Sequence, residues 1–374
     1  MVIVLSGGGT AGHINPALAV AELLVKAGHE VHFAGCPGGI EARLVPEAGL
    51  PFEPFEAAGF NRNHPASLIK ALRLMSKSTK KAIAWFDRIK PDVVVGFGGY
   101  VCMSVGRAAE KKGIPVVLHE QNSVMGLTNK YLAGKAARVA LTYEVAGQAL
   151  SDKSRLVLTG NPVRSSVFSA TREEGRDYMG IDDDQLVLVV FGGSLGARHI
   201  NTAVSALAKE LLEHPKLHVW HITGPKEYET VHEQLGLDSA QAARYHLVGY
   251  ENQMGKVLAG CDMVVARSGA TSLAEISALR IPALLVPFPF ATADHQTTNA
   301  REFVRAGAAC MVPDSEVEGP ASGKSSCGWW SRPRCASRCA RPQRASIPAM
   351  LRKNCRKSFF RSQPRDNQCT LEHT

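Results

Sequence analysis

A histidine follows a glycine-rich turn near the start of the chain, in the segment "SGGGTAGHINP" at residues 6–16. Gly7, Gly9 and Gly12 have the G-x-G-x-x-G spacing of a turn that binds the phosphates of a dinucleotide. His13 is expected in the first turn of the following helix, where backbone N–H groups favour an anion. Since an imidazole titrates near neutral pH, His13 is either a polar helix-capping residue or a general base beside a phosphate.

A dehydrogenase needs a further residue that this sequence lacks. In a dinucleotide-binding fold, an Asp or Glu about 20 residues after the turn closes the second strand and holds the ribose. Here that strand, "EVHFAG", ends in Ala34 and Gly35, and Glu30 stands at its opposite end. The glycine turn therefore indicates a phosphate site of another kind.

The elements that must position these residues follow a repeated strand–helix pattern. Residues 2–6, "VIVLS", form the continuous apolar run of a strand buried on both faces of a parallel sheet, and the segment after the turn has helical spacing. Residues 185–201, "QLVLVVFGGSLGARHIN", repeat the strand, the glycine turn and the helix. The sequence therefore predicts an α/β protein with two Rossmann-like domains facing across a cleft, at residues 1–160 and 161–315.

The net charge of +9 is concentrated in residues 316–374, which hold 12 Lys and Arg but only 4 Asp and Glu. The preceding body is almost neutral, which does not favour a nucleic-acid partner. Five of the nine cysteines also lie in this segment, and the other four lack the spacing of metal ligands, as expected in a reducing cytosol. The segment has no sustained period. It is either a disordered basic tail or, as we favour, a C-terminus translated from a shifted reading frame.

Seven motifs occur in order at the predicted strand ends: "GGGTAGHINPALAVAELL", "GFGGY", "HEQN", "GNPVR", "GGSLGAR", "RSGATSLAEI" and "PFPFATADHQTTNA". Together they resemble the MurG family, bacterial transferases that add N-acetylglucosamine to the lipid-linked muramyl-pentapeptide precursor of peptidoglycan. The resemblance covers about residues 1–315. It implies the two-domain GT-B fold, with the nucleotide sugar on the C-terminal domain and the lipid acceptor on the N-terminal domain.

The reaction implied by this resemblance is an inverting transfer from UDP-N-acetylglucosamine to the muramyl C4 hydroxyl of undecaprenyl-pyrophosphoryl-MurNAc-pentapeptide. The implied scheme uses neither a metal nor a cofactor. The "DDD" run at 182–184 matches the Asp-x-Asp motif of metal-dependent glycosyltransferases. However, it precedes a predicted strand and so lies at the end away from the cleft, where we expect a solvated turn.

The resemblance also implies roles at the donor site. Glu275 would accept both ribose hydroxyls, although its position alone also fits a helix-N-terminal Glu favoured by the helix dipole. Ser194 and Arg164 would bind the diphosphate. The other implied donor-site residues are Asn122, His295 and Gln296 at the sugar, Glu251 near the uracil, and Ala270 and Thr271 in the turn before the helix.

On the acceptor side, the implied residues of the first glycine turn are Thr10, Ala11 and Gly12, and Tyr100 follows the second. His13 is the favoured base, which deprotonates the muramyl C4 hydroxyl as it attacks the anomeric carbon. Glu120 is a second candidate, either as the base or as a group that orients one. The sequence leaves this choice open.

A lipid acceptor requires the protein to reach a membrane, yet no apolar run has the roughly 18–20 residues of a spanning helix, and the N-terminus does not resemble a signal peptide. Residues 64–90 interleave apolar and basic side chains, which suits adsorption to the anionic cytoplasmic face of the bacterial inner membrane. The apolar ones are Leu68, Ile69, Leu72, Met75, Ile83, Trp85 and Phe86, and the basic ones are Lys70, Arg73, Lys77, Lys80 and Lys81. An ordinary amphipathic helix packed on its own sheet would show the same pattern.

Two other functions stay open at this point. A UDP-N-acetylglucosamine 2-epimerase would use a similar two-domain fold without a lipid acceptor. A binding protein without activity would result if the altered C-terminus prevents closure of the domains.

Overall fold

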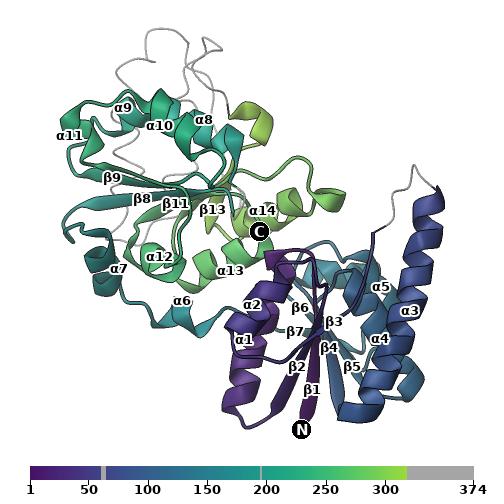
Figure 1. The fold of residues 1–374 in the computed structure, drawn as a ribbon. Coiled ribbons are helices and arrows are strands. Elements are labelled where there is room, and N and C mark those ends of the chain that lie inside the picture. The colour runs from purple at the N-terminus through teal and green to yellow at the C-terminus, as the bar shows by residue number, and fades with distance from the viewer. Residues whose placement is uncertain (60–64, 194–195, 318–374) are drawn as a thin grey trace, which may run out of the picture.

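The computed structural model describes residues 1–59, 65–193 and 196–317. These residues form two α/β lobes, each built around one parallel sheet (Figure 1). The predicted fold class is therefore confirmed. The segment 318–374, on which the prediction of an altered C-terminus rests, lies beyond the described residues.

The first sheet has seven parallel strands in the order β3-β2-β1-β4-β5-β6-β7. Their bounds are β1 Val2–Ser6, β2 Glu30–Gly35, β3 Phe52–Pro54, β4 Val93–Gly96, β5 Val116–Glu120, β6 Arg138–Leu141 and β7 Leu156–Leu158. The strand order reverses between β1 and β4, so the loops after these two strands lie side by side. In open α/β sheets such a reversal is where ligands bind.

The second sheet repeats this design with six parallel strands in the order β10-β9-β8-β11-β12-β13. Their bounds are β8 Leu186–Phe191, β9 Leu217–Ile222, β10 Tyr245–Val248, β11 Met263–Ala266, β12 Ala283–Leu285 and β13 Ala309–Met311. Here the order reverses between β8 and β11. The glycine turn after β8 and the "RSG" turn after β11 are thus the counterparts of the two glycine turns in the first lobe.

Helices cover both faces of each sheet. In the first lobe they are α1 Ala11–Lys26, α2 Glu41–Glu47, α3 Pro65–Ile89, α4 Tyr100–Lys112, α5 Leu127–Leu132 and η1 Glu144–Ala149. In the second lobe they are α6 Ser165–Ser169, α7 Arg172–Met179, α8 Arg198–Ala206, α9 Ala208–Leu211, α10 Tyr228–Leu235, α11 Ser239–Ala242, α12 Met254–Gly260, α13 Ala270–Ala278, η2 Thr292–Asp294, α14 His295–Arg305 and η3 Asp314–Glu316.

The apolar strands are buried on both faces, as their continuous hydrophobic runs predict. In β1, Ile3 and Leu5 belong to one hydrophobic core and Val4 to the core on the other face of the sheet. Alternation of side chains along a strand explains this division. Because both faces must be apolar, the strands could be identified from the sequence without any alternating pattern.

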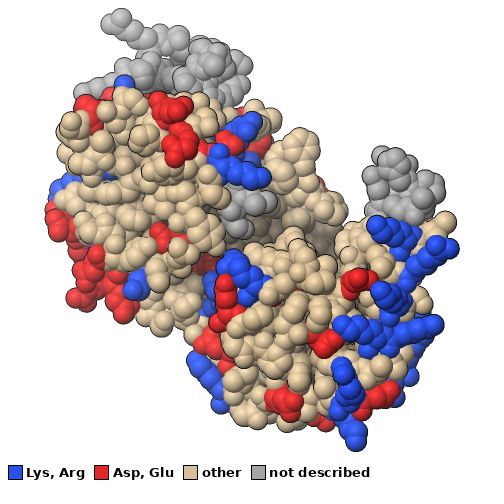
Figure 2. Space-filling view, viewed as in Figure 1, with Lys and Arg blue, Asp and Glu red and all other residues tan. Residues whose placement is uncertain are grey.

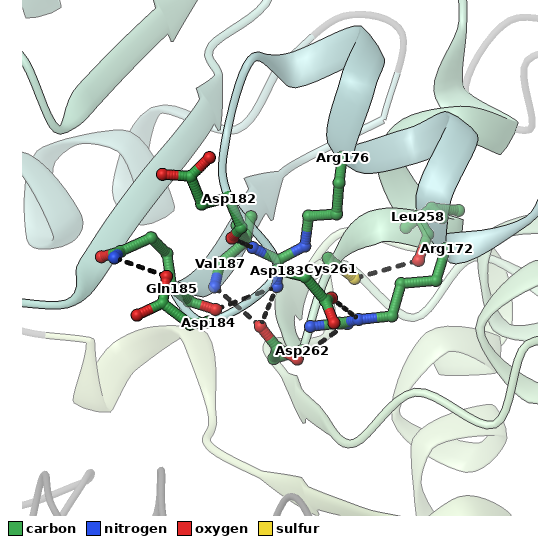
Figure 3. A network of polar contacts seen from close by, with 10 residues as sticks. All are labelled: Arg172, Arg176, Asp182, Asp183, Asp184, Gln185, Val187, Leu258, Cys261 and Asp262. Carbon is green, nitrogen blue, oxygen red and sulfur yellow. Dashed lines mark hydrogen bonds and ion pairs between the residues drawn. The ribbon is translucent and has the colours of Figure 1, made fainter.

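A buried carboxylate ties α7 to the second sheet (Figure 3). Oδ2 of Asp262 accepts hydrogen bonds from Nη2 of Arg176 at 2.7 Å and from the backbone N–H of Val187 at 2.9 Å, and its Oδ1 pairs with Nη1 of Arg172 at 3.0 Å. Both Arg176 and Asp262 are buried. A buried charge is tolerated in this way only when it is paired and hydrogen-bonded.

The adjacent "DDD" run forms an exposed turn before β8, at the end of the strand opposite the glycine turn. Asp183 pairs with Arg172 at 2.6 Å, and Asp184 pairs with Lys216 at 2.8 Å. This position confirms the predicted solvated turn. Within the described residues, no group of three or more His, Cys, Asp and Glu side chains could hold a metal ion.

The chain crosses between the lobes once in the described part, through residues 159–164. The amide Nδ2 of Asn161 donates to the carbonyl of Ala270 at 3.2 Å, at the start of α13. On the outer side of the junction, Glu22 of α1 accepts from the hydroxyl of Ser165 and pairs with Lys26 at 2.8 Å. These contacts fix the lobes against each other beside the crossover.

Candidate active site

Two glycine turns of the first lobe touch through their backbones. A Cβ atom on Gly99 would lie 2.6 Å from the carbonyl oxygen of Gly8, and one on Gly98 would lie 3.1 Å from Nε2 of His13. Gly98 and Gly99 also have φ angles of +98° and +86°, which side chains rarely permit. Only glycine allows this approach.

The imidazole of His13 is oriented by the same turn. Its Nδ1 lies 2.9 Å from the carbonyl oxygen of Gly8, and the hydroxyl of Thr10 lies 3.4 Å from the same nitrogen. A carbonyl oxygen can only accept, so Nδ1 carries the proton of the neutral ring. The unprotonated Nε2 is therefore the atom that can take a proton from a substrate.

A buried glutamate that the sequence did not indicate supports this turn from beneath. Glu41 of α2 is fully buried, and its Oε1 accepts from the backbone N–H of Cys36 at 3.0 Å. A Cβ on Gly8 would lie 2.6 Å from that oxygen. Gly8 is thus held between Glu41 and Gly99. A charged residue in the first turn of a short helix is ordinarily a surface feature, so no sequence signal identifies this role.

Glu120 is also buried, and its carboxylate is fully used by its own loop. Its Oε1 accepts from the backbone N–H of Asn122 at 3.1 Å, and its Oε2 accepts from the N–H of Gly126 and from Nδ2 of Asn129, both at 2.9 Å. The side chain makes no hydrogen bond to His13. Its geometry is that of a group that shapes residues 120–129.

In the second lobe, Glu275 lies one turn into α13 and is half-buried. None of the described residues forms a hydrogen bond with its carboxylate. Burial raises the pKa of Glu275 to about 7, although the nearby Arg164 guanidinium acts in the opposite direction. Arg164 is exposed and precedes α6. A carboxylate with this much of its hydration removed and no protein donor is suited to accept from a ligand.

Gln296 has an amide nitrogen that is free for a ligand. Its Oε1 accepts from the backbone N–H of Phe288 at 3.0 Å. The preceding residue, His295, donates from Nδ1 to the carbonyl of Thr292 at 2.8 Å. Ala293, just before α14, has a φ of +52°, and such strain is common where a loop is shaped for binding.

The two lobes meet at Asn299, a residue of a quoted motif to which the sequence assigned no role. Its Oδ1 accepts from the backbone N–H of Ser123 at 2.8 Å and from the Ser123 hydroxyl at 2.7 Å. Its Nδ2 donates to Oδ1 of Asn122 at 3.2 Å and to the carbonyl of Ser268 at 3.3 Å. The predicted sugar-binding residue Asn122 is therefore held from the opposite lobe.

The remaining predicted residues fall in three places. Glu251 is occupied by the protein, since its carboxylate accepts from the Tyr178 hydroxyl at 2.9 Å, the backbone N–H of Gln253 at 2.7 Å and Nε1 of Trp220 at 3.3 Å. Ser194 lies outside the described residues. The others stand at helix starts: Thr10, Ala11 and Gly12 at α1, Tyr100 at α4, and Ala270 and Thr271 at α13.

Comparisons with known proteins identify the family of this chain. Residues 3–141 match the "Glycosyltransferase family 28 N-terminal domain" and residues 187–321 match the "Glycosyltransferase family 28 C-terminal domain". The chain is 41% identical over 324 residues to the "UDP-N-acetylglucosamine--N-acetylmuramyl-(pentapeptide) pyrophosphoryl-undecaprenol N-acetylglucosamine transferase" of Halothermothrix orenii, with 85% of this chain and 87% of that protein covered. It is 42% identical to the transferase of the same name from Leuconostoc mesenteroides, with 86% and 88% covered.

A solved structure gives the same result for the fold. The crystal structure of Acinetobacter baumannii MurG matches this chain with a TM-score of 0.66 and 29% sequence identity. The match covers 86% of this chain and 88% of that one. The two-lobed GT-B arrangement is therefore confirmed by a second protein.

The contact between the glycine turns can be tested by adding one methyl group. Gly99→Ala is expected to destabilise the protein by more than the roughly 1–2 kcal/mol that a left-handed backbone costs an alanine, because Gly99 has a φ of 86° and a ψ of 170°, a region that glycine alone adopts readily, and because the new Cβ meets the Gly8 backbone. Gly9, in the first glycine turn, is the matched control, since its φ of +87° is close to that of Gly99 and nothing lies within 4 Å of an added Cβ. Equal losses of unfolding free energy in urea for both variants would contradict the contact.

Proposed function

The chain belongs to glycosyltransferase family 28, and on this premise we propose how its two lobes share one reaction. The activity is that of an N-acetylglucosaminyltransferase in peptidoglycan synthesis. It transfers N-acetylglucosamine from UDP-N-acetylglucosamine to the C4 hydroxyl of the lipid-linked muramyl-pentapeptide, the step from lipid I to lipid II.

A series of contacts at the lobe junction supports the roles proposed for the site residues, because it connects the acceptor side of the first lobe to the donor side of the second. The His13 ring lies against the second glycine turn, and Nε2 of Gln121 donates to the carbonyl of Phe97 in that turn at 3.0 Å. The next residue, Asn122, is held by Asn299 of the second lobe. A base in one lobe thus lies near the loop that reaches the donor site in the other.

His13 acts as the general base. Its Nε2 takes the proton of the muramyl C4 hydroxyl while that oxygen attacks the anomeric carbon of the donor. The bond between this carbon and the UDP oxygen breaks as the new bond forms, so the configuration inverts and a β-1,4 linkage results. The charge that develops on UDP is stabilised by Arg164 and by helix N-termini. Glu120 positions the loop and takes no proton.

The donor binds to the second lobe. Glu275 accepts from the ribose hydroxyls, for which its unpaired carboxylate is suited, and the family resemblance assigns Ser194, which lies outside the described residues, to the diphosphate. Glu251 keeps the loop near the uracil in place, because its side chain is bonded to three protein donors. The sugar hydroxyls face the amide nitrogens of Gln296 and Asn122, with His295 beside them.

The acceptor binds to the first lobe. Its diphosphate lies against the two glycine turns, where the first N–H groups of α1 and α4 are available to an anion. The residues that line this part are Thr10, Ala11, Gly12 and Tyr100. Tyr100 is more than half exposed, so its ring is accessible to a large ligand.

Acceptor-dependent release of UDP from UDP-N-acetylglucosamine tests the activity. The 374-residue chain is expected to release UDP when a short-chain lipid I analogue is added. Replacing the base, His13→Ala, should lower kcat by about 10²–10⁴-fold and leave the affinity for UDP unchanged. His29→Ala, three residues beyond the other end of α1, serves as the control. Acceptor-independent epimerisation of the sugar would indicate a 2-epimerase, and an unaltered kcat in His13→Ala would exclude this base.

The raised pKa of Glu275 predicts a pH-dependent donor affinity. The ionised carboxylate accepts from two hydroxyls, whereas the protonated form offers one acceptor fewer, so binding favours the ionised form. The affinity for UDP-N-acetylglucosamine should therefore rise as the pH increases toward about 7 and level off above it. Calorimetry with wild type and Glu275→Gln checks this, since the variant has no carboxylate to titrate. An equal slope in both proteins would refute the role.

Helix α3 contacts the membrane in this proposal. It runs along the outer side of the first lobe, where Lys and Arg side chains gather (Figures 1 and 2). Leu68, Ile69 and Leu72 in its first half are 43–55% exposed. None of the described helices is long and apolar enough to cross a membrane. Exposed apolar side chains beside basic charge suit adsorption to an anionic lipid surface.

The second half of α3 exposes no large apolar side chain to solvent, and two of its lysines are paired. Trp85 and Phe86, for which the sequence left open contact with lipid or packing on the sheet, are buried in the core of the lobe. Of the basic residues, Lys77 pairs with Glu56 at 3.1 Å and Lys81 pairs with Glu53 at 2.7 Å. The large apolar residues exposed to lipid therefore lie near the start of the helix, and of the basic residues named from the sequence, those without an ion pair to a described residue are Lys70, Arg73 and Lys80.

Charge reversal tests this surface. Lys70→Glu with Arg73→Glu should weaken binding to vesicles containing phosphatidylglycerol at low salt by at least about tenfold, since each cation near an anionic surface contributes about 1 kcal/mol. The matched control is Lys77→Glu with Lys81→Glu, which changes the charge by the same amount at residues that are already paired with carboxylates. If the control lowered vesicle binding as much as the first pair, the proposed surface would be wrong.

A further inference from the structure

The amide of Asn299 is fully buried and uses every hydrogen-bonding position that it has. Its oxygen accepts twice, from the backbone N–H and the hydroxyl of Ser123, and its nitrogen donates twice, to Asn122 and to the carbonyl of Ser268. Two of these partners lie in the first lobe and one in the second. No other described side chain is shared in this way between the lobes at the junction of β5 and α14.

The orientation of this amide is fixed by partners that cannot change roles. The backbone N–H of Ser123 can only donate, so it must face the Asn299 oxygen, and the carbonyl of Ser268 can only accept, so it must face the nitrogen. The nitrogen of Asn299 then requires an acceptor in Asn122. Hence Oδ1 of Asn122 is turned toward Asn299, and its Nδ2 is left without an acceptor among the described residues.

Gln296, one turn before Asn299 on α14, follows the same rule. The backbone N–H of Phe288 donates to its oxygen and so fixes which way the amide faces, and its Nε2 has no acceptor among the described residues. Each lobe therefore contributes one amide with its N–H₂ group free. Two such donors suit a ligand rich in oxygen acceptors, such as a sugar.

We propose that Asn299 is a positioning residue for the donor sugar: it clamps Asn122 from the opposite lobe so that an amide N–H, and not a carbonyl, faces the sugar oxygens. This inference rests on the proposed function, since it takes the donor to be a nucleotide sugar. It adds that the sugar receives hydrogen bonds from both lobes, from the amide of Asn122 in the first and the amide of Gln296 in the second. The uridine and diphosphate parts bind without this clamp.

Asn299→Asp is the sharpest variant, because it replaces the two N–H donors by an acceptor oxygen. That oxygen would face the Ser268 carbonyl and Oδ1 of Asn122, so the Asn122 amide must turn over and present its carbonyl to the sugar. Ser123→Ala is a milder variant that removes one of two donors to the clamp. Asn201→Asp is the matched control, since Asn201 is equally buried but its amide bonds only to Thr223 and His221 within the second lobe.

The readout is the ratio of two dissociation constants, for UDP-N-acetylglucosamine and for UDP, measured by calorimetry without acceptor. Binding of UDP also shows that each variant is folded. We expect this ratio to rise about tenfold in Asn299→Asp and two- to threefold in Ser123→Ala, as the loss of oriented hydrogen bonds predicts. It should stay at the wild-type value in Asn201→Asp. Asn122→Ala should raise the ratio as much as Asn299→Asp, and the double variant should raise it no further.

An unchanged ratio in Asn299→Asp with UDP binding retained would overturn the proposal. If Asn299→Asp does not fold, an unchanged ratio in Ser123→Ala would overturn it instead. Equal rises in Asn299→Asp and Asn201→Asp would also overturn it, because they would show a general loss of structure. Failure of the proposed function is seen separately, as absence of acceptor-dependent UDP release by the wild-type chain.

Discussion

The backbone contact between Gly8 and Gly99 is the constraint on which the site depends. A side chain at either position would separate the turns, since a Cβ on Gly99 would lie 2.6 Å from the Gly8 oxygen. Glu41 lies on the other side of Gly8, so the Gly8 backbone is held in place between Glu41 and Gly99. Its carbonyl oxygen accepts a hydrogen bond from Nδ1 of His13 and so selects the tautomer that is protonated there. A contact without side chains thus decides which ring nitrogen can act as a base.

This contact exists because the strand order of the first sheet reverses between β1 and β4, which brings the following turns together. The second lobe has the same reversal between β8 and β11, with Glu275 and Asn299 on the helices near its carboxyl edge. The two lobes are therefore similar devices facing each other. Asn299 joins them at one buried point, so the geometry of the loop after β5, which contains Asn122 and Ser123, depends on the second lobe.

Much of this architecture could be predicted from the strands, because a strand that is covered by helices on both faces must be apolar along its whole length. The runs at β1 and β8 are buried on both faces, and that requirement is visible in the sequence itself. Once the strands are known, the site residues can be sought in the turns that follow them, because ligands bind at the carboxyl ends of the strands in open α/β sheets. The resemblance to a known family then supplied their roles, which spacing alone left open for His13 and Glu275.

The parts that could not be predicted depend on contacts distant in sequence or on the backbone. The partners of Glu120 are two backbone N–H groups and one amide, which no residue pattern reveals. Asn299 contacts residues 176 and 177 positions away. The sequence could not decide whether Trp85 faces lipid or the core, because an amphipathic helix has the same periodicity whether its apolar face meets lipid or its own sheet.

The protonation of the His13 ring is the central claim, and ¹⁵N NMR of histidine-labelled protein measures it directly. The chain has 13 histidines, and His13→Gln identifies the signals of this one by their loss. The structure predicts that, in the neutral ring, Nδ1 is protonated and Nε2 carries the lone pair. A ring protonated at Nε2 under these conditions would contradict the hydrogen bond to Gly8 and the assignment of His13 as the base.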